Sequence, residues 1–145
     1  MIKRKSLGAT LLILAAFAPL ASAQDTPESW RTASNGNWTA PARWSPEVVP
    51  NDGTPAGSLY AATIGLAGSY TVALNSNITV DNLTLGSALT GALLNQTAGT
   101  LTVNEAATVL AGTYTIGGTL DAGAVNLDGG AITLDTGDTI NAQNV

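Results

Sequence analysis

The sequence contains no cysteine and no histidine, and only 10% of its 145 residues are charged. Without cysteine the fold has no disulfide bonds, so packing and backbone pairing alone must hold it together. The missing residue types also remove the usual general base, the thiol nucleophile and the commonest zinc ligands. No Gly-rich turn leads into a helical pattern, which argues against a phosphate-binding loop. We therefore expect no catalytic residue, no metal and no cofactor, and the chain is not predicted to be an enzyme.

Positive charge is scarce and lies mostly at the N-terminus. A basic segment at residues 3–5 precedes an apolar stretch over residues 7–20, followed by a small-residue cleavage site between Ala23 and Gln24. This order predicts a cleaved signal peptide over residues 1–23. The apolar stretch is shorter than the ~20 residues that a membrane-spanning helix needs. We expect an exported protein, secreted or on the cell surface, with the periplasm as an alternative and no membrane attachment after cleavage.

Cleavage would leave a strongly acidic chain. Arg31 and Arg43 would face ten Asp and Glu residues, a net charge of 2 − 10 = −8. Such a chain repels phosphate backbones and has no basic patch for an anionic membrane surface. Nucleic acid is therefore not an expected partner. Extracellular polysaccharide and surface proteins remain candidate partners, and the sequence does not decide the oligomeric state.

A short alternating pattern recurs through most of the chain, in which Thr or Asn stands between two apolar residues. Alternation places the outer two side chains on one face of a strand and the middle one on the other. Gly, Ala, Asn, Asp and Ser fill the segments between, as is typical of turns. The triplets are Tyr70-Thr71-Val72, Ile78-Thr79-Val80, Leu83-Thr84-Leu85, Leu101-Thr102-Val103, Tyr114-Thr115-Ile116, Val125-Asn126-Leu127 and Ile132-Thr133-Leu134.

These triplets predict an all-β fold with short strands, specifically a parallel β-helix or solenoid. The triplets that begin at Ile78, Leu101 and Val125 are spaced by 23 and 24 residues, a plausible length for one coil. The apolar phase inverts at Asp81-Asn82, which predicts a bulge or corner there. A β-sandwich is the alternative, although it favours longer and more evenly spaced strands. The predicted core includes Val80, Leu101, Val103, Ile116, Leu127 and Ile132.

The first part of the mature chain differs from the rest. Residues 24–62 hold all three tryptophans and five of the six prolines, so we expect an irregular N-terminal cap segment ordered by its aromatic side chains. Residues 63–145 would form the coils. Nothing after residue 134 looks like a polar cap, so we expect the coils to be truncated at the C-terminus. Exposed aromatic rings stack on sugars, so Trp30, Trp38 and Trp44 are candidate carbohydrate-stacking residues as well as candidate plugs for the open end.

The residues of the cap segment also carry a family resemblance. Gly36-Asn37-Trp38, then Trp44-Ser45-Pro46, then the strand pair over residues 70–85 and the step over 96–103 follow one another in a fixed order. This order resembles the N-terminal region of bacterial exported β-helical surface proteins. These include autotransporter-type adhesins and proteins that carry PEP-CTERM or dockerin-type sorting modules. The resemblance covers roughly residues 30–134, departs at Glu47 where glycine is usual, and implies architecture without shared catalytic residues.

Three carboxylates recur at seven-residue spacing. Asp121, Asp128 and Asp135, with Asp138 just beyond, would suit catalysis or calcium binding if adjacent coils brought them together, but Asp is also a common turn residue. The main prediction is an exported structural or adhesive β-solenoid module without catalysis of its own. The alternatives are the N-terminal part of a β-helical polysaccharide-acting enzyme and a carbohydrate-binding module.

Overall fold

A computed structural model describes residues 24–87 and 90–145 of the chain. The predicted signal peptide and Ala23 lie outside the described residues, whereas Gln24 is described and exposed. The described chain is all-β, and its parallel sheets are arranged as a β-solenoid of about four turns. The predicted fold class is thereby confirmed, and the β-sandwich is not the fold.

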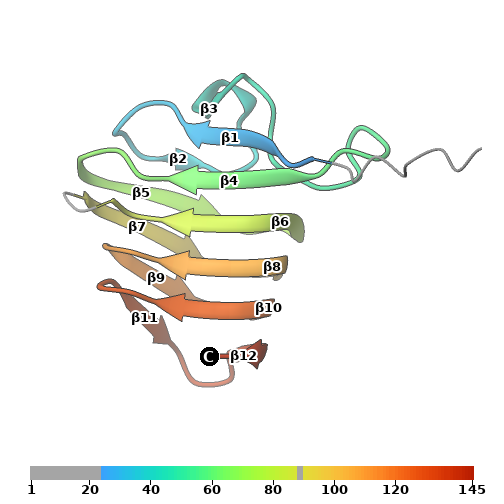
Figure 1. Ribbon diagram of the computed structural model, residues 1–145. Coiled ribbons are helices and arrows are strands. Elements are labelled where there is room, and N and C mark those ends of the chain that lie inside the picture. Colours follow the sequence, from blue (N-terminus) through green and yellow to red (C-terminus); the bar gives the residue numbers. More distant parts are fainter. Residues whose placement is uncertain (1–23, 88–89) are drawn as a thin grey trace, which may run out of the picture.

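Two sheets run along the axis of the solenoid (Figure 1). The first has the strand order β12-β10-β8-β6-β4-β1-β3, and the second has the order β11-β9-β7-β5-β2. Every pairing is parallel except that of β1 with β3. The strands are β1 (Thr26–Trp30), β2 (Gly36–Asn37), β3 (Trp44–Ser45), β4 (Tyr60–Ile64), β5 (Gly68–Leu74), β6 (Ile78–Leu85), β7 (Thr90–Gln96), β8 (Thr100–Val109), β9 (Thr113–Ile116), β10 (Thr119–Leu127), β11 (Ala131–Leu134) and β12 (Thr139–Asn144), and a 3-10 turn covers Pro41–Arg43.

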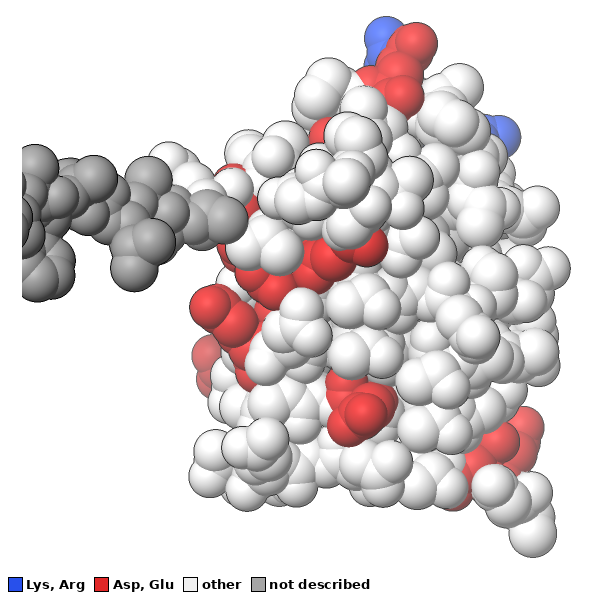
Figure 2. Space-filling view, turned by 90° about the vertical axis from the view of Figure 1, so that its right-hand side faces the viewer, with Lys and Arg blue, Asp and Glu red and all other residues white. Residues whose placement is uncertain are grey.

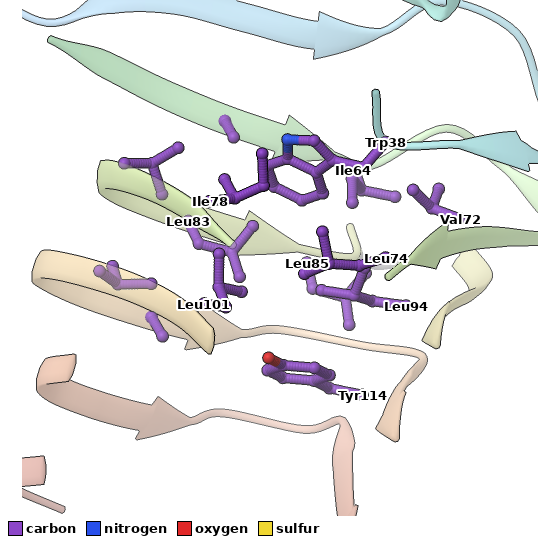
Figure 3. Packing of buried hydrophobic residues seen from close by; sticks show 14 of the residues in the cluster. Trp38, Ile64, Val72, Leu74, Ile78, Leu83, Leu85, Leu94, Leu101 and Tyr114 are labelled. Atoms are coloured by element: carbon purple, nitrogen blue, oxygen red, sulfur yellow. The ribbon is translucent and has the colours of Figure 1, made fainter. Parts of the chain in front are cut away.

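The interior is built from inward columns, each with one apolar side chain per coil. Leu83 lies between Ala62 and Ala107 in the parallel register, and Leu85 lies between Ile64 and Val109. These side chains, with others from the second sheet, pack into one continuous buried cluster (Figure 3). The alternating triplets are thus the reason for the fold, since each one supplies two inward residues and one outward residue.

The phase break at Asp81-Asn82 is a strand irregularity, as the pattern predicts. Val80 pairs with Val103 and Asn82 pairs with Ala106, so the register shifts between these two positions. A similar shift occurs in β10 between Ala122 and Ala124. The irregularities lie inside the strands and do not split them, so β6, β8 and β10 reach 8 to 10 residues and are longer than the short strands that the triplets predict.

The N-terminal segment is more regular than the prolines suggest. β1 pairs in parallel with β4 and in antiparallel with β3, so backbone pairing orders the cap together with its tryptophans. Pro27 is tolerated at the second residue of β1, near the strand start where proline is least disruptive. β3, which begins at Trp44, and the loop that follows it lie at this end of the stack (Figure 1).

The last coil is less well packed than the sequence indicates. Val80, Leu101, Val103 and Ile116 are fully buried as predicted, but Leu127 is 57% exposed and Ile132 is only partly buried. No further coil of the described chain packs on these residues. The triplet that begins at Val125 also belongs to a different column from the triplet that begins at Leu101. Leu101 pairs with Leu120, whereas Val125 pairs with Ala107. The spacing of 24 residues between Leu101 and Val125 is therefore not a coil length.

Candidate functional site

The three tryptophans form one buried cluster at the capped end of the solenoid. The Trp44 ring packs edge-on against Trp30, with 5.2 Å between ring centroids, and against Trp38 at 4.9 Å. Every indole N–H has a backbone acceptor: Trp30 donates to Ser34 O at 3.3 Å, Trp38 to Pro50 O at 3.1 Å and Trp44 to Trp38 O at 2.6 Å. Buried tryptophans with satisfied N–H groups are structural anchors.

This arrangement corrects the suggestion that the tryptophans stack on sugars. The exposed fractions of Trp30, Trp38 and Trp44 are 1%, 0% and 0%, so no ring presents a face to solvent. The physical reason is their position. No coil of the described chain precedes the first one, and large rings cover the apolar area that would otherwise face water.

The predicted aspartate row does not come together. Asp121 lies within β10, Asp128 lies in the corner between β10 and β11, and Asp135 lies in the corner between β11 and β12. The three residues therefore occupy different parts of the last coils. Asp138 is instead a turn residue whose Oδ2 accepts a hydrogen bond from the Asp135 N–H at 3.0 Å. This local role is the usual one for Asp in turns.

A different polar cluster, which no local sequence pattern indicates, joins the cap to the first coils. The Asn104 amide donates to Asp52 Oδ2 at 3.1 Å and to Asp81 Oδ1 at 2.6 Å. On the neighbouring strand β6, the Asn82 amide donates to Asp25 at 3.0 Å and to Glu105 at 2.7 Å. We call these six residues the corner cluster: Asp25, Asp52, Asp81, Asn82, Asn104 and Glu105.

The corner cluster lies where β6 and β8 bend at their irregularities. Figure 2 shows acidic side chains gathered on this side of the molecule, whereas Lys and Arg atoms appear only near its capped end. The two asparagines place an amide N–H₂ between carboxyl groups that would otherwise repel one another. The six residues therefore form a hydrogen-bonded structural network that contains four acidic side chains.

Burial and crowding change the protonation of acids in the cap. Desolvation by burial and, next, the nearby charge of Asp81 raise the pKa of Asp52 to about 6, although the hydrogen bond from the Tyr60 N–H acts in the opposite direction. Burial also raises the pKa of Glu28, which points inward from β1. Both Glu28 carboxyl oxygens are buried without a hydrogen-bond partner among the described residues. The cap therefore favours the neutral form of two of its acids.

The outer surface carries columns of hydroxyl and amide side chains. One column runs over five strands and consists of Ser29, Thr63, Thr84, Thr108 and Asn126. Neighbours in such columns bond to one another where they are close: Asn126 donates to Thr108 Oγ1 at 3.3 Å, and the hydroxyls of Thr133 and Thr115 are 3.0 Å apart. Successive strands in a sheet are ~4.8 Å apart, so these polar groups repeat at a fixed interval along the axis.

Over residues 24–87 and 90–145, no group of three or more Asp or Glu side chains is arranged to hold a metal ion. In the same residues no helix is long and apolar enough to cross a membrane. Comparison of the chain with protein-family models, with curated proteins and with solved structures finds no match. The columns of outward polar groups are thus the feature of the described surface on which a function can be argued.

Proposed function

We propose that this chain is an exported, non-catalytic β-solenoid module that serves a structural and adhesive role on the surface of a bacterial cell or in its surroundings. The observation that carries the proposal is the continuity of the outward Thr and Asn columns over successive coils. A packed apolar interior and parallel ladders hold these columns in a fixed spacing. Such a stack presents a repeated polar face without needing a pocket for chemistry.

The sequence supports the exported setting and the absence of catalysis. Residues 1–23 have the composition of a signal peptide, and the chain has no cysteine whose redox state would depend on the compartment. Without histidine or cysteine, a hydrolase would have to rely on carboxylates. Asp121, Asp128 and Asp135 are separated in the fold. The carboxylates of the corner cluster are instead bonded to the amides of Asn82 and Asn104, as in a structural network, so we favour the structural role over the enzyme alternative. The bacterial surface or secreted setting, including the adhesin-like and PEP-CTERM-like character, rests on the resemblance of residues 30–134.

Export is tested by expressing the full chain in a bacterial host and sequencing the N-terminus of the product outside the cytoplasm. We expect it to begin at Gln24. The matched control is Ala23→Trp, which destroys the small-residue cleavage site and is expected to accumulate at full length. A wild-type chain that stays in the cytoplasm with its first 23 residues would overturn the proposal. So would release of reducing ends when the purified chain is incubated with polysaccharides.

A further inference from the structure

A groove of about 580 Å³ crosses the outer surface where β8, β10 and β12 lie side by side. Its volume is within the range of small-ligand sites. It is lined by polar groups from three successive coils, and Asn104, Asp121, Asn141 and Gln143 are exposed. Its lining includes Thr102, Asn104, Asp121, Gly123, Asn141 and Gln143, together with apolar neighbours of these residues on the three strands.

The floor of the groove is backbone because of Gly123. This residue lies at the irregularity of β10, between Ala122 and Ala124. A Cβ atom at this position would come 2.5 Å from the backbone oxygen of Glu105 and 2.6 Å from that of Asn104. Side chains do not tolerate such contacts with backbone. The close approach of two coils therefore requires glycine and leaves the surface hollow at this point.

The polar groups around the hollow are available to a ligand. Within residues 24–87 and 90–145, the side chains of Thr102, Asp121, Asn141 and Gln143 make no hydrogen bond to the protein. The corner cluster is different, since Asn82 and Asn104 each donate to two carboxylates. Asn104 lies at the edge of the groove and belongs to that bonded cluster, whereas in the described chain Thr102, Asp121, Asn141 and Gln143 keep their side-chain donors and acceptors unpaired.

Register and charge indicate the kind of ligand. Thr102, Asp121 and Asn141 occupy one column, so a hydroxyl, a carboxylate and an amide follow one another at ~4.8 Å along the axis. A polymer with hydroxyl groups repeated along its length can therefore form a hydrogen bond with one of these side chains in each coil. The carboxylate of Asp121 and those of the corner cluster repel an anionic polymer.

We propose that this groove binds a neutral linear polysaccharide, with the polymer chain lying along the solenoid axis. The inference rests on the proposed function and names the ligand class and the site for its adhesive role. Each lost neutral hydrogen bond is expected to weaken binding about two- to tenfold. Since several such bonds act together along the polymer, single substitutions should weaken binding without abolishing it.

The test is electrophoresis of the purified chain through native gels that contain hydroxyethyl cellulose or galactomannan, with polygalacturonate as the anionic comparison. We expect one or both neutral polymers to retard the wild type and polygalacturonate to leave it unaffected. Thr102→Ala and Asn141→Ala should each reduce the retardation. The matched controls are Thr54→Ala and Asn75→Ala, at exposed loop positions outside both the groove and the outward columns, and melting temperatures should show that all four variants fold.

The inference is overturned if neither neutral polymer retards the chain, or if groove and control variants behave alike. It is also overturned if polygalacturonate retards the wild type as strongly as the neutral polymers do. An exported and correctly cleaved chain that shows no retardation would leave the proposed export standing and remove only the groove. A chain that is never exported would overturn the proposed function whatever the gels show.

Discussion

Asp52 and Asp81 lie on either side of the boundary between the cap and the coils, and the Asn104 amide bridges them over 3.1 Å and 2.6 Å. Asp52 belongs to the loop between β3 and β4, whereas Asp81 lies in β6. Asp52 also accepts the Tyr60 N–H at 2.7 Å, at the start of β4. The protonation of Asp52 is therefore coupled to how firmly the cap is held on the stack.

The first prediction concerns pH. The pKa of Asp52 is raised from 3.8 to about 6 by desolvation first and by Asp81 next, so the folded state binds this proton more tightly than the unfolded state. Its contribution to stability is complete below about pH 3.8 and is lost as the pH rises through 6. The raised pKa of Glu28 acts in the same direction. We expect the melting temperature to fall between pH 4 and pH 7.5.

The variant Asp52→Asn isolates this effect, because its side chain is neutral at every pH and its oxygen can still accept the Tyr60 N–H. Above pH 6 the variant should melt at a higher temperature than the wild type, and near pH 4 the difference should disappear. Asp128→Asn is the matched control, since it removes the same charge from an exposed turn at the other end. Parallel melting curves for the wild type and Asp52→Asn across this pH range would contradict the prediction.

Much of the fold could be predicted from the sequence, because alternation is a local property. The triplets identify inward residues such as Val80 and Val103, and the phase inversion at Asp81-Asn82 locates an irregularity. The predictions fail where burial depends on what lies next along the axis. Leu127 has the same local pattern as Val103 but has no coil of the described chain packed over it.

The polar sites could not be predicted, because they depend on register between distant segments. Asn104 and Asp52 are 52 residues apart in the chain, and Asn82 and Asp25 are 57 apart. The groove likewise requires the pairing of β8 with β10 and of β10 with β12. In the sequence, Gly123 resembles any turn glycine, and only the 2.5 Å approach of the Glu105 backbone oxygen shows why it is needed.

The second prediction concerns the tryptophan cluster. Trp38 is fully buried and contacts Trp44, so Trp38→Ala should lower the free energy of unfolding by about 3–5 kcal/mol, as is typical of buried aromatic truncations. Urea denaturation measures the loss. Val48→Ala, at a side chain that is 39% exposed, is the control and should change stability by about 0.5 kcal/mol or less.

The same cluster gives an optical test of where polysaccharide binds. Because no tryptophan ring is exposed, hydroxyethyl cellulose should leave the tryptophan emission unchanged even when it retards the chain in a gel. A shift of the emission spectrum on adding the polymer would mean that at least one ring is reached by the ligand. That result would restore the stacking role of Trp30, Trp38 or Trp44.

The third prediction tests the solenoid core. Val103 is fully buried between Val80 and Ala122 in the parallel register, so Val103→Asp places a carboxylate in an apolar column. Burying an unpaired charge costs a free energy comparable to the whole stability of a typical domain, which is about 5–15 kcal/mol. We expect the variant to be lost from the soluble fraction. Thr108→Asp, at an outward position of the same strand, should remain folded, and a folded Val103→Asp with the wild-type melting temperature would refute the inward assignment.

The fourth prediction concerns a buried polar network in the second sheet. Gln96 is 1% exposed; its Oε1 accepts the Tyr114 hydroxyl at 2.6 Å, and its Nε2 donates to the backbone oxygens of Gly99 at 2.8 Å and Thr119 at 3.0 Å. Burial raises the pKa of Tyr114, which keeps this hydroxyl a donor. Tyr114→Phe leaves the Gln96 oxygen unpaired and should cost about 1–3 kcal/mol in urea denaturation.

A double-mutant cycle separates this network from simple packing. Gln96→Leu alone should also destabilise the chain, because it leaves the Tyr114 hydroxyl without its acceptor and removes the two hydrogen bonds from Gln96 Nε2 to the Gly99 and Thr119 carbonyls. In that background Tyr114→Phe should cost much less than it does alone, since the hydroxyl it removes has already lost its acceptor. Additive effects of the two substitutions would mean that the 2.6 Å hydrogen bond contributes nothing specific. In that case the two side chains would stabilise the coil only through the volume they fill.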